Sequence, residues 1–79
     1  MRVKTPKCVV AFATTTDAMA FEAKAASLGL PGRMIPLPSA ISAGCGLAWC
    51  APIQECDTIA QALAQHQVAY EGISEVELY

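Results

Sequence analysis

Four cysteines are the residues of this sequence with the most evident chemical potential: Cys8, Cys45, Cys50 and Cys56. Their spacing contains no Cys-x-x-Cys pair and matches no common zinc or iron–sulfur pattern. Because His66 is the only histidine, we expect no metal site and no cofactor. An even cysteine count in a short chain can indicate a disulfide framework, but such scaffolds are rich in loops and this sequence is not. We therefore interpret each thiol separately.

Cys45 differs from the other three because Gly44 and Gly46 flank it. Glycines leave the sulfur accessible and permit unusual backbone angles. The thiolate is the reactive form of cysteine, and backbone N–H groups at a helix N-terminus stabilise such an anion. These residues favour a nucleophilic or sulfur-carrying Cys45. The alternative that they leave open is a tight turn holding a small apolar side chain.

The other three cysteines are expected to have structural roles. Cys8 begins a predicted strand and Cys50 ends another, so these two are candidate cross-strand neighbours far from Cys45. Cys56 falls on the apolar stripe of a predicted helix, where a free cysteine usually acts as a small hydrophobic core residue. This arrangement leaves no resolving cysteine near Cys45.

The elements that must position Cys45 follow from hydrophobic patterning and from helix start and stop signals. They are a strand over 8–13 or 8–14, a helix capped at Thr14–Asp17 and running to Leu28, a short edge strand over 33–38, a strand from 45 or 46 to 51, a helix that begins at Pro52 and ends near His66, and a strand over 69–78. The order β-α-β-β-α-β predicts one domain (1–79, core about 8–78). Its predicted fold class is α+β, a ferredoxin-like sandwich in which an antiparallel four-stranded sheet carries two helices on one face.

Right-handed crossovers place the third strand of this fold beside the first, and antiparallel to it. The start of the third strand then lies next to the end of the first strand, where the first helix begins. We therefore expect an anion at Cys45 to meet backbone groups of its loop (Ser42, Gly44, Gly46) and of the helix start (Thr15, Thr16). The carboxylate of Asp17, in the same turn of helix, would oppose a thiolate that came close.

Composition excludes several classes of function. The chain has 79 residues, of which 54% are hydrophobic and 15% charged, and its formal net charge is −2. A nucleic-acid binder would need a basic stripe, and a membrane span about 20 apolar residues, so we expect neither partner. The short apolar run after Lys7 is a poor signal peptide, which favours the cytoplasm. We interpret Arg33 as an edge-strand charge that discourages aggregation. Low charge makes a protein partner or a homo-oligomer a reasonable expectation.

Taken together, these segments resemble the small DUF3343 proteins, which are Se/S carrier-like. Five segments carry the resemblance: Val9–Phe12, Thr14–Ala18, Arg33–Pro38, Ile41–Ala48 and Tyr70–Ile73. It covers about residues 8–75, and the hallmark cysteine of the family falls on Cys45. Members often have a basic residue where this chain has Ser39, and the other three cysteines are not part of the pattern. The resemblance implies a bacterial, cytoplasmic protein of selenium or sulfur metabolism.

The leading hypothesis is a carrier in which Cys45 holds sulfur or selenium as a persulfide or selenosulfide. Its partners would be sulfur- or selenium-transferring enzymes, and the protein would be a co-substrate more than a stand-alone enzyme. The first alternative is a non-catalytic interaction or assembly module in which Cys45 is structural. The second is a thiol-dependent oxidoreductase or redox sensor, which would require an intermolecular disulfide because no resolving cysteine is expected nearby.

Overall fold

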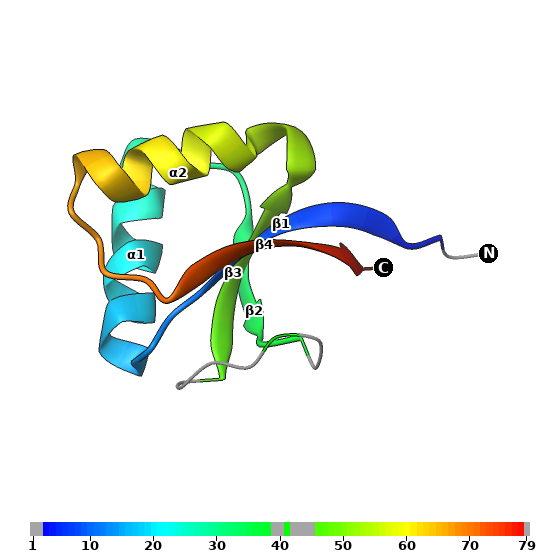
Figure 1. Ribbon diagram of the computed structural model, residues 1–79. Coiled ribbons are helices and arrows are strands. Elements are labelled where there is room, and N and C mark those ends of the chain that lie inside the picture. The colour runs from blue at the N-terminus through cyan, green and yellow to red at the C-terminus, as the bar shows by residue number, and fades with distance from the viewer. Residues whose placement is uncertain (1–2, 39–40, 42–45, 79) are drawn as a thin grey trace.

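The computed structural model describes residues 3–38, 41 and 46–78 and confirms the predicted ferredoxin-like α+β order (Figure 1). The elements are β1 (Thr5–Ala11), α1 (Thr15–Leu28), β2 (Arg33–Pro36), β3 (Leu47–Pro52), a 3₁₀-helix (Ile53–Glu55), α2 (Cys56–Gln65) and β4 (Gly72–Leu78). The four strands form one sheet in the order β2-β3-β1-β4. All three strand pairs are antiparallel, so β3 lies between β1 and β2 as predicted.

Helix α1 begins and ends at the predicted signals. The Thr14 side chain accepts a hydrogen bond from the Asp17 N–H (3.1 Å), which satisfies one of the free donors of the first turn. Gly29 follows the last helical residue with a left-handed φ of 67°, and its N–H is directed at the carbonyls of Ala25 and Ala26. A left-handed C-cap is easiest for glycine, which has no Cβ.

The register of β1 against β3 decides which side chains face the helices. Val10 of β1 is opposite Trp49 of β3, and both belong to the hydrophobic core. The core also takes Phe21 from α1 and Leu63 from α2, so both helices cover the same face of the sheet (Figure 1). Because side chains alternate along a strand, Cys50, next to Trp49, belongs to the uncovered face.

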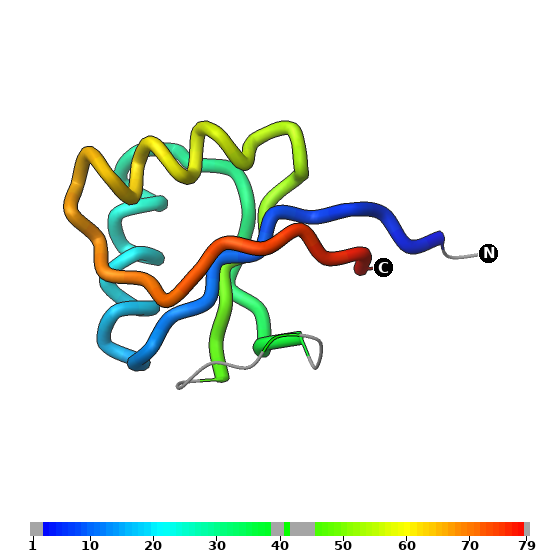
Figure 2. Tube along the Cα trace, viewed as in Figure 1, coloured from blue at the N-terminus to red at the C-terminus, as the bar shows by residue number. Residues whose placement is uncertain are grey.

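Trp49 connects the core to the segment that leads into β2. Its ring meets that of Phe21 edge-to-face, with centroids 5.2 Å apart and planes at 86°. Its indole Nε1–H donates to the Pro31 carbonyl (3.1 Å), so the polar edge of this largely buried ring is satisfied. The tube in Figure 2 also shows β1 and β4 side by side, which agrees with the pairing of Thr5 with Leu78 across these two strands.

The structure corrects the expected arrangement of the cysteines. Cys8 lies opposite Ala51, and Cys50 lies opposite Val9, so Cys8 and Cys50 point to opposite faces of the sheet and are not cross-strand partners. Cys8 is instead bonded to Cys56 in a disulfide, with a Cα–Cα distance of 5.4 Å. The bond is possible because Cys8 faces the helices and the short 3₁₀-helix after β3 brings the first residue of α2 over it. Treating these two thiols as separate core residues was therefore wrong.

Candidate thiol site at the start of β3

The proposed nucleophile Cys45, together with Ser42 and Gly44, lies outside the described residues. The remaining predicted site residues belong to two described segments. Gly46 immediately precedes β3, and Thr15 and Thr16 begin the first turn of α1.

Gly46 has the backbone conformation that the flanking glycines suggested. Its φ is +76°, a region in which a residue with a Cβ is strained, although a Cβ built there would find nothing within 4 Å. Its carbonyl accepts a hydrogen bond from the Leu37 N–H (2.8 Å), which extends the pairing of β2 and β3 beyond the strand ends. Gly46, the residue after Cys45 in the sequence, is thus held at the end of β2 in a backbone conformation that favours glycine.

The first turn of α1 supplies the backbone donors. Asp17 N–H is already bonded to the Thr14 side chain, and Ala18 N–H donates to the Thr14 carbonyl (3.1 Å). Helix geometry leaves the N–H groups of Thr15 and Thr16 without an intrahelical acceptor, and both residues are exposed. Together with the helix dipole, these donors favour an anion at this end of α1.

The strand register brings Gly46 and the first turn of α1 to the same end of the sheet. Ala11, the last residue of β1, pairs with Ala48 of β3. Beyond this pair, β1 leads forward along the chain to the α1 cap at Thr14, and β3 leads back along the chain to Gly46. Because the two strands are antiparallel, Thr14 and Gly46 lie beyond the same end of the ladder. The view in Figure 1 shows the N-terminus of α1 and the start of β3 at this end. The structure therefore places Gly46 and the start of α1 beyond the same end of the β1–β3 ladder, while the juxtaposition of the loop with the helix start stays a prediction.

Asp17 is the acidic residue of the first turn of α1 and is half-buried. Its carboxylate interacts favourably with the helix dipole but repels any other anion at this terminus. The donors of Thr15 and Thr16 therefore have to compensate for one negative charge. The end of α1 is therefore not strongly electropositive, and an anion there would be held mainly by backbone N–H groups.

Within the described part of the chain, Cys50 is the one free thiol, because Cys8 and Cys56 form the disulfide. The same residues include no cluster of three or more His, Cys, Asp or Glu side chains that could hold a metal ion. Neither of the described helices is both long enough and apolar enough to cross a membrane. Sequence reasoning missed the disulfide, because the pairing of Cys8 with Cys56 depends on long-range packing.

A family model described as "Putative Se/S carrier protein-like" matches residues 7–75 of the chain. The match therefore includes Cys45, both helices and almost the entire sheet. No curated protein matches the chain, and no solved structure matches it either.

Proposed function

The chain belongs to the Se/S carrier protein-like family, and from this membership we propose that Cys45 accepts a sulfur or selenium atom and delivers it to a partner enzyme. The observation that carries the proposal is the match over residues 7–75, which contains the cysteine flanked by glycines. The positive φ of Gly46 and the backbone donors of Thr15 and Thr16 support it, since Gly46 follows Cys45 directly in the sequence and the donors lie at the same end of the sheet as Gly46.

The transfer requires no oxidant beyond the donor. The Cys45 thiolate attacks the terminal sulfur of a persulfide on the donor enzyme, and a new S–S bond forms on Cys45. The S–S bond of the donor breaks, and its cysteine leaves as a thiolate with the electron pair. The product is a Cys45 persulfide anion, whose charge the backbone N–H groups of the loop and of α1 would stabilise. A nucleophile of the acceptor enzyme then attacks the terminal sulfur and releases the Cys45 thiolate.

The Cys8–Cys56 disulfide removes two of the four cysteines from those that could accept the transferred sulfur or selenium atom. Neither sulfur of that pair can act as a nucleophile while the bond is intact. Cys50 remains as the alternative thiol, and it lies on strand β3 toward the end opposite Gly46. The proposal therefore predicts that Cys45 and Cys50 behave differently toward a persulfide donor.

Intact mass after incubation with a cysteine desulfurase and free cysteine tests the proposal. We expect wild type and Cys50→Ser each to gain one sulfur atom, and Cys45→Ser to gain none. An adduct of equal yield on Cys45→Ser would refute the assignment. Replacing cysteine by selenocysteine, with a lyase specific for it, distinguishes selenium from sulfur by the mass of the adduct.

An assembly module remains the alternative, and one observation favours it. Strand β4 is an edge of the described sheet and is seven residues long, so its outer backbone groups can pair with a second chain. The rate of Cys45 alkylation, measured in Cys50→Ser at neutral pH, separates the two functions. A rate above that of a model thiol supports the carrier, and a rate at or below it supports the module.

A further inference from the structure

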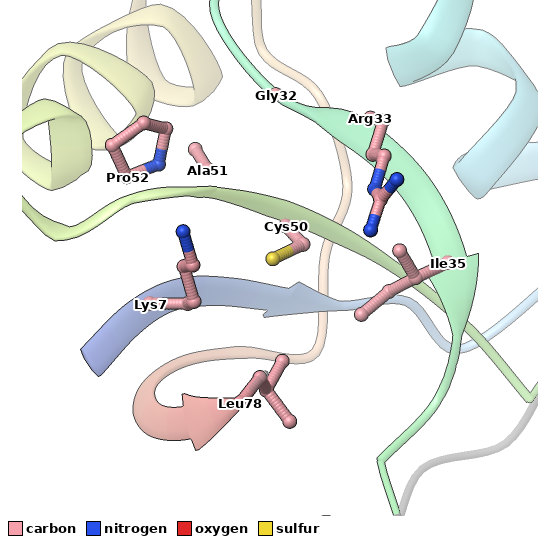
Figure 3. A pocket seen from close by; sticks show the side chains of 8 residues that line it. All are labelled: Lys7, Gly32, Arg33, Ile35, Cys50, Ala51, Pro52 and Leu78. Atoms are coloured by element: carbon pink, nitrogen blue, oxygen red, sulfur yellow. The ribbon is translucent and has the colours of Figure 1, made fainter. Parts of the chain in front are cut away.

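A cavity of about 360 Å³ opens on the face of the sheet that the helices do not cover (Figure 3). Its walls include the free thiol of Cys50 and the side chains of Lys7 and Arg33. Ile35 and Leu78 add apolar surface. The volume is within the range of small-molecule sites, whose usual lower limit is about 300 Å³.

The strand register explains why the three reactive or charged groups meet. Arg33 of β2 lies directly opposite Cys50 of β3, so the two side chains share a face. Lys7 of β1 is paired with Pro52, two residues from Cys50 along β3, which places Lys7 on the same face. Figure 3 shows the Cys50 sulfur between the Lys7 ammonium and the Arg33 guanidinium in that view.

The charge of this cavity is opposite to that of the whole chain. The formal net charge of the protein is −2, yet the residues that line the cavity include two cations and no carboxylate. Lys7 and Cys50 are half-buried, and Arg33 is exposed. Such a site attracts an anion, and the thiol can bond to it covalently. Arg33 lies on the edge strand β2, as interpreted from the sequence, and its register also places it beside a thiol.

We propose that Cys50 is a modification site for small disulfides that carry carboxylates. Lys7 and Arg33 hold the carboxylates, and Cys50 exchanges with the disulfide. This proposal concerns a different cysteine from Cys45 and does not depend on the carrier function. The apolar wall of Ile35 and Leu78 accommodates the aliphatic part of the same molecule.

The reaction is a thiol–disulfide exchange and balances without another reactant. Cys50 loses its proton to solvent, and the thiolate attacks one sulfur of the small disulfide. A mixed disulfide forms on Cys50 as the S–S bond of the reagent breaks. The second half of the reagent leaves as a thiolate with the electron pair. A reducing thiol reverses the modification in the same way.

The test compares three reagents that differ in charge: the disulfide of 3-mercaptopropionate, that of 2-mercaptoethanol and cystamine. The protein is the Cys45→Ser variant, so that the reaction of Cys50 is followed without that of Cys45. The mixed disulfide is quantified by intact mass. We expect the anionic reagent to react fastest and the cationic one slowest. Removing one cation by Lys7→Gln or Arg33→Gln should lower the ratio of anionic to neutral rates by about twofold to fivefold.

Matched variants make the result specific to the cavity. Lys24→Gln removes an exposed cation from α1 and should leave the ratio unchanged. Arg33→Lys keeps the charge and should keep most of the preference, while high salt should reduce it. Equal ratios in the parent, Lys7→Gln and Arg33→Gln would overturn the proposal. An adduct that persists in Cys45→Ser/Cys50→Ser would also overturn it, since the mixed disulfide would then lie on Cys8 or Cys56, which requires their bond to be reduced, and not on Cys50.

Discussion

Cys8 in β1 is joined to Cys56, the first residue of α2, by a disulfide that spans 48 positions of the sequence. Cys8 is completely buried under the helices. The loop that the bond closes contains α1, β2 and β3, so the bond fixes the start of α2 on the sheet while the rest of the core packs. Disulfides are rare in reducing compartments, which makes the redox state of this pair informative about where the protein resides.

Removing this bond should destabilise the fold substantially. For a closed loop of this length, chain entropy predicts a loss of about 4 kcal/mol in the free energy of unfolding, a large part of the stability of so small a domain. Urea unfolding of Cys8→Ala/Cys56→Ala against wild type measures the loss. Cys50→Ala serves as the control, because it removes the unbonded thiol. Equal midpoints for wild type with and without reductant would contradict this role of the bond.

The Thr14 cap should contribute measurably to α1. Thr14→Ala removes the hydrogen bond from the Asp17 N–H and should lower the free energy of unfolding by about 1 kcal/mol. Thr14→Ser keeps a hydroxyl in the same position and should restore most of the loss. If Thr14→Ser were as unstable as Thr14→Ala, the methyl group rather than the hydrogen bond would be responsible.

Gly32 and Gly29 should respond differently to alanine. Both have positive φ, but a Cβ at Gly32 would come within 2.5 Å of both the Cys50 carbonyl oxygen and Nε1 of Trp49, whereas a Cβ at Gly29 meets nothing within 4 Å. Gly29→Ala should therefore cost only the backbone strain of about 1–2 kcal/mol. Gly32→Ala adds a steric clash and should cost clearly more in urea unfolding. A smaller loss for Gly32→Ala than for Gly29→Ala would contradict the close approach.

Local signals made α1 predictable almost to the residue, because the Thr14 cap and the Gly29 stop act through adjacent backbone groups. Strand order followed from the element order and the handedness of crossovers. The partner of Cys8 could not be predicted in this way. It depends on the face to which β1 turns that side chain and on where α2 begins, and both are set by long-range packing.

The two thiol sites differ in the same respect. The positions of Gly46 and of the helix start could be anticipated, since both follow from local sequence signals and the topology brings them to the same end of the sheet. The cavity at Cys50 could not, because it exists only when β2 and β1 are in the register that places Arg33 and Lys7 beside it. A shift of one residue would move either cation to the other face of the sheet.

The proposed function depends on Cys45 as the thiol that carries the sulfur atom, and mapping the transferred atom tests this role most directly. The protein is loaded by a cysteine desulfurase supplied with cysteine labelled with heavy sulfur, alkylated without reduction and cleaved after Trp49. The two fragments stay joined by the Cys8–Cys56 disulfide, so the heavy sulfur is assigned to Cys45 or Cys50 by fragmenting the joined pair in the mass spectrometer. We predict heavy sulfur on Cys45 and none on Cys50. Heavy sulfur on Cys50, with none on Cys45, would contradict the proposed role of Cys45.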